Sequence, residues 1–401
     1  VTWYVLSETH STLSVSWLVI LVTLPGLFVP WLGGVLIDRV DRRWLGITLD
    51  AARAVVVLGV AEIAHLGLIR IWHVYAMTVL LGIGFAVYWS TANSLVQEII
   101  PREWLVNANS AVMVAVQGGM TTAGALVGFI YARAGLAGVL GIDGTTYVVS
   151  AVCLLLLRRG YHPPQRHHDA IESAGGRASG EIPLELSEPG VLPFLEGSLA
   201  AGVVRDMKEG LRYLRENHRV FALGFTLACM MAGVLSSTVV IVALAQDILH
   251  AGARGYGYIE AGWALGAFAG GFSAQAISRG KPVRVMIAAL SILAVGQALF
   301  PYARWLILAA AMNVVFGACR ALAGVLTQSS LMAIVPQRLM GRTQSAFAIM
   351  ATFLQVTMSF ALGWLAENAG LPVAFLVLAL IYGLAVLAAV RVRFLTPAAQ
   401  L

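Results

Sequence analysis

The sequence predicts an all-α membrane protein of two pseudo-symmetric six-helix bundles, with the first span of the first bundle truncated. Three observations predict this fold. The 401-residue chain is 59% hydrophobic and only 11% charged, whereas soluble domains carry about 25% charged residues. Apolar segments of about 20 residues, long enough to cross a bilayer, follow one another almost without interruption. Patterns in the first half recur in the second half some 235 residues later.

The expected spans are the apolar segments between short polar turns, and they must be helices because lipid leaves backbone groups no outside partner. After a stub at residues 1–6, full spans are expected at 13–37, 44–66, 73–98, 108–132, 135–157, 219–249, 256–278, 282–301, 304–335, 343–367 and 371–395. They divide the chain into an N-terminal bundle (1–157), a cytoplasmic linker with an amphipathic helix (158–218) and a C-terminal bundle (219–401).

Basic residues are distributed unevenly between alternate loops. Most lie in one set of loops, in the linker and at the C-terminus, whereas the opposite loops hold only Arg70, Arg133, Arg254 and Arg304. The positive-inside rule therefore places the C-terminus in the cytoplasm. The same distribution accounts for the formal net charge of +6 without a nucleic-acid partner.

The linker is the one long hydrophilic interval. Its start holds His162, His167 and His168, and a Gly/Ser/Glu-rich stretch follows. A solvated flexible linker is the expectation here, with metal binding by the histidines as the alternative. Residues 199–218 follow a helical pattern with one apolar face, which suits a helix lying on the membrane surface.

The cysteines give no sign of a disulfide framework or a metal site. Cys153, Cys229 and Cys319 lie singly in apolar spans without ligand-like spacing, so we expect them to act as small apolar side chains. Glu62 and His65 have an i, i+3 spacing that can bind a metal, but no second pair accompanies them. We expect neither a metal nor a cofactor.

The two halves of the chain repeat each other. Gly33-Gly34 recurs as Gly270-Gly271, and Arg42 as Arg279, both 237 residues later. Parallel repeats of six spans are typical of a class of secondary transporters. The same offset places Val1 opposite Thr238, inside the seventh span. We therefore expect about 19 residues of the first span to be missing from a twelve-span protein, because the stub is too short to cross a bilayer.

The turn after the second span carries the most informative motif. Residues 33–43, GGVLIDRVDRR, place glycines, carboxylates and arginines between two long apolar segments. Residues 34–43 resemble the signature between spans 2 and 3 of the major facilitator superfamily, with Asp41 in place of a usual glycine. Residues 100–109, 142–147 and 207–214 are similar to the subgroup of enterobactin exporters and macrolide-efflux proteins. The resemblance implies the major facilitator fold in a bacterial cytoplasmic (inner) membrane, and it leaves the cargo open.

We expect this motif to gate the cytoplasmic side. The expected gating residues are Gly34, Asp38, Arg39, Arg42, Arg43 and Arg279. Glycines allow close helix approach, and Asp38 can meet the positive end of a neighbouring helix. Arg42 and Arg43 can pair with carboxylates or reach lipid headgroups. Alternating access needs such contacts to form in one state and break in the other; the alternative is that these charges only set the topology.

Two departures from the superfamily weaken the case for proton antiport. The antiporter signature of span 5 requires a Gly-Pro pair, and residues 118–128 keep the glycines but lack the proline. The signature arginine of span 4 is also absent from residues 89–93.

Ionisable residues inside spans are candidates for function because each costs roughly 2.5–3.5 kcal/mol at a span centre. Arg320 lies halfway along span 10, which lines the cavity in the resembled fold, and is expected to contact an anionic group of the cargo or a coupling carboxylate. A structural ion pair or hydrogen bond is the alternative. Glu260 is a candidate proton carrier or a solvated charge at the outer mouth of span 8. Asp143 in span 6 is a coupling candidate or a structural partner, and Asp50 and Arg53 should pair with each other or with the motif turn.

Several uncharged residues are candidates for cargo contact. Trp89 and Tyr88 in span 4 either form an apolar cargo wall or pack in the bundle core. Four polar residues either bind cargo or join helices: Gln117, Asn313, Gln328 and Gln355.

The expected function is proton-coupled efflux of an amphipathic small molecule, such as a drug, siderophore or lipid-like compound, by a monomer that uses alternating access and the proton gradient across the lipid bilayer. The alternatives are an uncoupled facilitator or a lysolipid flippase on the same fold. A polytopic membrane enzyme is disfavoured, because the sequence lacks a Walker A run, a His-Glu-x-x-His pair and a Gly-x-Ser-x-Gly elbow.

Overall fold

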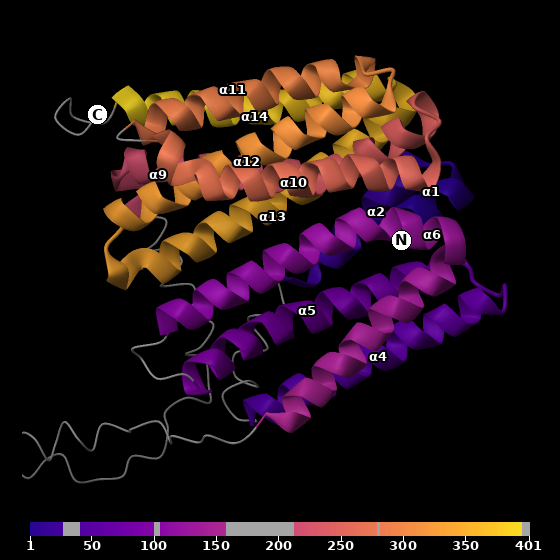
Figure 1. The fold of residues 1–401 in the computed structure, drawn as a ribbon. Coiled ribbons are helices and arrows are strands. Elements are labelled where there is room, and N and C mark those ends of the chain that lie inside the picture. Colours follow the sequence, from indigo (N-terminus) through magenta and orange to yellow (C-terminus); the bar gives the residue numbers. More distant parts are fainter. Residues whose placement is uncertain (27–40, 100–104, 158–211, 279–280, 395–401) are drawn as a thin grey trace, which may run out of the picture.

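The described part of the protein is helical throughout. The computed structural model describes residues 1–26, 41–99, 105–157, 212–278 and 281–394, and every regular element within them is a helix (Figure 1). Most of the expected linker therefore lies outside the described residues, as do the first residues of its amphipathic helix.

The N-terminal bundle is formed by the helices α1 (Thr2–Thr9), α2 (Thr12–Thr23), α4 (Arg42–His65), α5 (Ile71–Ile99) and α6 (Leu105–Leu156). Helix α6 contains two of the expected spans. Its backbone leaves helical geometry at Gly135, where φ is 62°, a value that glycine adopts without the steric cost of a side chain. This break lies where the sequence predicts the boundary between spans 5 and 6.

The C-terminal bundle follows the expected spans closely. It consists of α9 (His218–Ala243) with the π-helical turn η2 (Leu244–Ile248), α10 (Gly252–Ser278), α11 (Pro282–Leu299) with the 3-10 turn η3 (Phe300–Tyr302), α12 (Leu306–Ile334), α13 (Gln337–Asn368) and α14 (Leu371–Phe394). The span predicted at 343–367 agrees with the apolar part of α13, Thr343–Asn368. The helix itself begins earlier, directly after Pro336, and its first turns carry the polar residues Gln337, Arg338 and Arg342.

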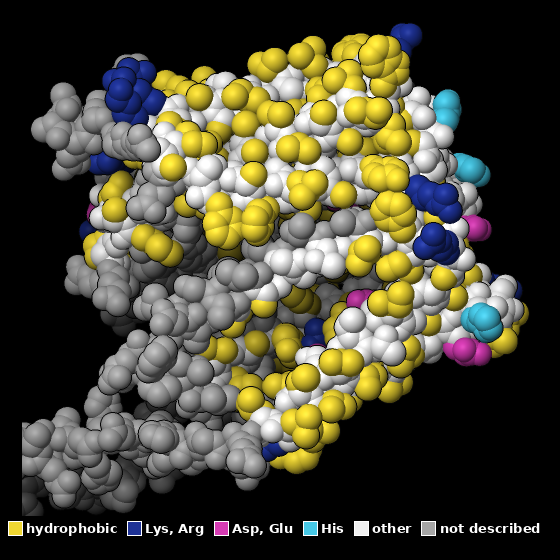
Figure 2. All heavy atoms as spheres, in the orientation of Figure 1, with side chains coloured by type: hydrophobic (Ala, Val, Ile, Leu, Met, Phe, Trp, Pro, Cys, Tyr) yellow, Lys and Arg dark blue, Asp and Glu magenta, His cyan; other side chains and the backbone are white. Residues whose placement is uncertain are grey.

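The described helices suit a membrane. Seven helical segments are long and apolar enough to cross one. Helix α4 is not among them, because Asp50, Arg53 and Glu62 lower its hydropathy. Figure 2 shows hydrophobic side chains over most of the visible lateral surface, with Lys, Arg and His side chains gathered near the two ends. An exposed apolar belt of this size marks contact with lipid rather than water.

The repeat is visible in the turn that follows the first span of each bundle. His10 ends α1 with φ of 50°, and His250 follows η2 with φ of 46°. These are the two non-glycine residues with positive φ in the described backbone. His10 also lies close enough to Asp247 for electrostatic interaction, so both turns lie at the same end of the molecule. We call this the α1–α2 end.

The two bundles meet along two main helix pairs. Helix α2 packs against α13, and α6 packs against α10, while α1 and α2 also contact α9. Figure 1 shows the N-terminal bundle, drawn in indigo to magenta, beside the orange and yellow C-terminal bundle, with α2 and α6 lying next to α10 and α13. The bundle interface is therefore the place to look for groups that take part in a relative movement.

Candidate functional site

A polar contact joins the bundles at the α1–α2 end. Glu367 of α13 accepts hydrogen bonds from Ser11 Oγ at 2.5 Å and from the backbone N–H of Leu13 at 3.0 Å. Thr12 Oγ1 donates to the carbonyl of Gly363 at 3.1 Å. The carboxylate thus lies at the N-terminus of a helix in the other bundle, where the helix dipole favours negative charge. We refer to Ser11, Thr12, Leu13, Gly363 and Glu367 as the polar clasp.

A second contact between α2 and α13 lies deeper in the interface. Gln355, which is 4% exposed, donates from Nε2 to Thr23 Oγ1 at 2.7 Å. One turn away on α13, Ser359 bonds Ser236 of α9 at 3.0 Å. Of the two roles left open for Gln355, joining helices is therefore the one seen in this structure.

Helices α6 and α10 meet through glycines. A Cβ built on Gly257 would lie 2.9 Å from Gly128 Cα, and one built on Gly124 would lie 4.0 Å from the carbonyl oxygen of Glu260. The contact between Gly128 and Gly257 requires residues without side chains, as is common between membrane helices, whereas Gly124 has room for a methyl group. Because a Cβ on Gly128 or on Gly257 would collide with backbone, the contact is sensitive to substitution at either position.

Glu260 lies beside this glycine contact. Its carboxyl is only partly exposed, and it interacts with the phenol of Tyr256, one turn earlier on α10. Tyr256 is buried and stacks on Trp3 of α1 with ring centroids 6.2 Å apart. Partial burial at the bundle contact supports the proton carrier over the solvated charge, and both roles stay predictions. The sequence did not reveal the burial, because Glu260 faces the other bundle and not the loop.

Arg320 lies at the middle of α12, as predicted. Its Nη2 contacts the Met231 thioether at 3.5 Å, a weak acceptor. Its Nε is buried and has no hydrogen-bond partner in the described part of the chain. Gly324, one turn on, makes room for the guanidinium, because a Cβ there would lie 2.7 Å from Nη1.

A buried ion pair occupies the N-terminal bundle. Arg53 donates to Asp50, which is 1% exposed, so the predicted pairing of these residues is confirmed. Ser150 of α6 donates to the second carboxylate oxygen of Asp50 at 2.6 Å. The guanidinium carbon of Arg53 also lies 4.3 Å from the ring centre of Tyr88 and 4.7 Å from that of Tyr147. This network joins α4, α5 and α6.

The network bears on two open interpretations. Tyr88 packs against Arg53 inside the bundle, which supports the core-packing alternative for this residue. Asp143 lies near enough to Arg53 for electrostatic attraction, which supports its structural role. The sequence did not predict that Tyr147 and Ser150 take part in this network. A helix that is apolar on several faces does not indicate which side packs inward.

Asn313 of α12 also joins helices. It is buried and donates from Nδ2 to the carbonyl of Ile259 on α10 at 2.7 Å. The close packing of these two helices continues at Gly270, where a Cβ would lie 2.2 Å from the carbonyl oxygen of Ala318. The glycine repeated from the motif turn therefore has the close-packing role expected of it.

Comparison with known proteins gives the family. The profile of the Major Facilitator Superfamily matches residues 1–282. The chain belongs to the major facilitator superfamily. Among solved structures, it is similar to the nucleoside transporter NupG, with TM-scores of 0.68 for a point mutant and 0.66 for NupG itself, at 11% and 13% identity. Each alignment covers 98% of this chain and 93% of the NupG chain.

A second transporter is similar as well. The inward-open conformation of the xylose transporter XylE from E. coli gives a TM-score of 0.65 at 14% identity, covering 96% of this chain and 86% of XylE. At these identities the likeness is one of fold alone, and it is the family match that points to a transporter. No curated protein sequence matches the chain.

The superfamily motif is described only in part. Gly34, Asp38, Arg39 and Arg279 lie outside the described residues, and the side chains of Trp89 and Gln117 are not described either. Arg43 is described. It donates to the backbone carbonyls of Leu154 at 2.8 Å and Leu155 at 2.6 Å, and contact with a lipid headgroup stays a prediction. Arginine at the last carbonyls of a helix offsets the negative end of the helix dipole.

Asp41, the residue that departs from the superfamily signature, has a clear structural role. Its carboxylate accepts from the backbone N–H groups of Arg43 at 2.9 Å and Trp44 at 3.2 Å. It is therefore the N-cap of α4, a position that strongly favours Asp, Asn, Ser or Thr.

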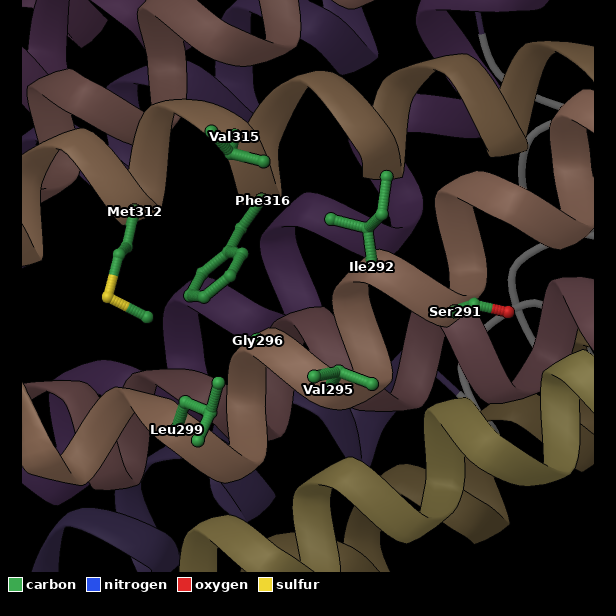
Figure 3. A pocket seen from close by; sticks show the side chains of 8 residues that line it. All are labelled: Ser291, Ile292, Val295, Gly296, Leu299, Met312, Val315 and Phe316. Carbon is green, nitrogen blue, oxygen red and sulfur yellow. The ribbon is translucent and has the colours of Figure 1, made fainter.

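An apolar groove lies between α11 and α12, away from the bundle interface. It encloses about 470 Å³ and is lined by Ser291, Ile292, Val295, Gly296, Leu299, Met312, Val315 and Phe316 (Figure 3). Several of these side chains are exposed on the apolar belt. Because its lining offers almost no polar group to orient a cargo, we assign this superfamily member's candidate site to the bundle interface instead.

Proposed function

We propose that this major facilitator protein exports an amphipathic small molecule in exchange for protons, as a monomer in a bacterial cytoplasmic membrane with its C-terminus in the cytoplasm. Its resemblance to the enterobactin-exporter and macrolide-efflux subgroup supports an exporter. The observation that carries proton coupling is Glu260, a partly buried carboxyl at the contact between α10 and α6, where it interacts with the phenol of Tyr256.

The proposed cycle follows from where Glu260 lies. The α1–α2 end is the outer end in the predicted topology, and the bundles are in contact there. When they separate at this end, the Glu260 carboxyl meets water and can take a proton from outside. A neutral carboxyl enters a closed, apolar interface at much lower cost than a carboxylate. Protonation would thus favour the closed outer end, which links proton uptake to the movement of the bundles.

At the cytoplasmic end of the proposed pathway, the charged motif of residues 33–43 has the closing role. We propose that Asp38, Arg39, Arg42 and Arg279 hold the cytoplasmic ends together when the outer end opens. Breaking the polar clasp outside and forming these ionic contacts inside would then be one movement, as alternating access requires. An uncoupled facilitator or a lysolipid flippase would use the same movement without a proton on Glu260.

Proton coupling is tested in liposomes that contain a lumenal pH dye, with drugs, siderophores and lysolipids added in turn. Cargo-dependent proton movement should be lost in Glu260→Gln while cargo exchange continues. The matched control is Glu62→Gln, because Glu62 is an exposed carboxyl at the end of α4. Cargo flux without any proton movement in the wild type would favour the facilitator, and unchanged proton movement in Glu260→Gln would exclude this residue.

A further inference from the structure

The guanidinium of Arg320 lacks a counter-charge in this conformation. In the described part of the chain, its Nη2 donates to the Met231 thioether, and its buried Nε has no partner. The ionisable group that acts on it electrostatically is the phenol of Tyr382, a neutral side chain at ordinary pH. A guanidinium is always charged and has five N–H donors to satisfy. Leaving it unpaired inside a membrane bundle is costly.

The coupling carboxylate considered for Arg320 does not pair with it here. Glu260 interacts with Tyr256, and neither Glu260 nor Arg320 acts electrostatically on the other. Asp143 interacts with Arg53, which lies with it in the N-terminal bundle. The described acidic residues thus leave the charge of Arg320 free for a ligand.

The surroundings of Arg320 favour a ligand with an apolar part. Met231 is 41% exposed although it lies on α9, a helix that packs against α12, α13 and α14 of its own bundle and against α1 and α2 of the other. Part of the Met231 side chain is therefore free to contact a ligand beside the guanidinium. Gly324 frees the volume in which the guanidinium lies. The Met231 thioether next to the Arg320 guanidinium favours a ligand whose anionic head group is followed by an apolar chain.

We propose that the transported molecule is an anionic amphiphile whose carboxylate or phosphate binds Arg320. This inference rests on the proposed transport function and specifies its substrate class. The planar guanidinium matches both anions through paired N–H donors. Nε, which is now unpartnered, and one Nη supply such a pair, and Met231 contacts the start of the apolar chain.

The test is equilibrium binding to the full-length protein in nanodiscs. The probes are dansyl-labelled decyl chains that differ only in the head: carboxylate, phosphate monoester, methyl ester or trimethylammonium. Binding is followed by energy transfer from tryptophan. Wild type should bind at least one anionic probe about tenfold or more tighter than the ester and the cation, and the two anionic arms distinguish carboxylate from phosphate. Arg320→Gln should remove that preference, a loss of roughly 10- to 100-fold for a charged hydrogen-bond pair, without weakening the ester.

Three further variants keep the test decisive. Arg320→Lys retains the positive charge but not the paired N–H donors of the guanidinium, so it should keep part of the preference for anionic head groups. Gly324→Ala should weaken anion binding with no change in charge, because the new Cβ would displace Nη1. Arg254→Gln, at an exposed arginine near the start of α10, should change nothing. Equal binding of all four heads, or an unchanged preference in Arg320→Gln, would overturn the inference.

Failure of this inference is distinguishable from failure of the proposed function. Binding in nanodiscs needs neither a proton gradient nor transport. A head-group preference that depends on Arg320, without cargo-driven proton movement in liposomes, would contradict proton antiport and support the anion site. Proton-coupled export without any head-group preference would support antiport and contradict the anion site.

Discussion

Gly128 of α6 and Gly257 of α10 lie backbone to backbone across the bundle interface, so that a Cβ on Gly128 would come within 2.8 Å of Gly257 Cα. The contact lies at the α1–α2 end, beside Glu260 and not far from the polar clasp. Aromatic side chains flank this backbone contact, because Phe129 of α6 meets Tyr258 of α10 edge to face with ring centroids 5.2 Å apart. The distance between α6 and α10 at these two glycines therefore indicates whether the bundles are closed at the α1–α2 end.

Gly128→Ala should shift the protein toward the state that is open at this end. The new methyl group collides with α10 backbone, and overpacking of this kind costs about 1–3 kcal/mol. The closed-to-open ratio should then fall by roughly 5- to 100-fold. Spin labels on α6 and α10 at this end, read by double electron–electron resonance, measure the ratio. The control is Gly141→Ala on the same helix, where a Cβ meets no atom within 4 Å. Equal distance distributions for both variants would contradict the closed contact.

Glu367→Ala should have a smaller effect in the same direction. It removes the carboxylate that accepts from Ser11 and from the N–H of Leu13. Because charges at exposed helix N-termini contribute about 0.3–1 kcal/mol, we expect the closed-to-open ratio to fall about two- to fivefold. The same spin-label measurement reports it, and Glu216→Ala, an exposed glutamate that pairs with Arg212 on its own helix, serves as the control. A change equal to that of the control would show that the clasp does not hold the bundles.

Asp50→Asn should destabilise the N-terminal bundle without altering the bundle interface. The substitution leaves Arg53 charged and buried, and breaking a buried pair on one side costs about 3–5 kcal/mol. Thermal unfolding in detergent should therefore begin at a lower temperature than in the wild type, while Glu62→Gln on the same helix should not change it. Adding Arg53→Met to Asp50→Asn should restore part of the loss, because no uncompensated charge remains. If the double variant were less stable than the single one, the cation–π contacts of Arg53 would outweigh the ion pair.

Asp38→Asn should slow cargo exchange while the protein stays folded, because the motif carboxylate is expected to hold the cytoplasmic ends together. Counterflow in liposomes measures the rate. Asp41→Asn is the matched control: Asp41 caps α4, and asparagine caps a helix about as well as aspartate. Unchanged exchange in Asp38→Asn would reduce the motif to a topology signal.

Much of the fold follows from the sequence because span length and apolar composition are local properties. Hydropathy places the ends of α14, and of α9 taken together with η2, within a residue of those observed, and even the break at Gly135 falls between two predicted spans. The partners across the interface are not local. Ser11 and Glu367 are 356 residues apart, and the local sequence around either residue does not predict its pairing with the other.

The candidate site was predicted less evenly, for the same reason. The mid-span position of Arg320 follows from counting along its helix, and the pairing of Asp50 with Arg53 follows from i, i+3 spacing. Where a side chain of a largely apolar helix points is not encoded in its neighbours. The sequence therefore does not show that Tyr88 packs on Arg53, that Arg43 bonds the end of α6, or that Glu260 lies at the contact with the other bundle.

The most direct test of the account is to tie the bundles together at the α1–α2 end and ask whether transport stops. Ser11→Cys and Glu367→Cys would be introduced after replacing Cys153, Cys229 and Cys319 by alanine, and joined with a short bifunctional thiol reagent that a reductant cleaves. Each single cysteine variant treated with the reagent is the control. We expect cross-linking of the double variant to abolish cargo flux and reduction to restore it. Full flux through the cross-linked protein would contradict movement of the two bundles about this end.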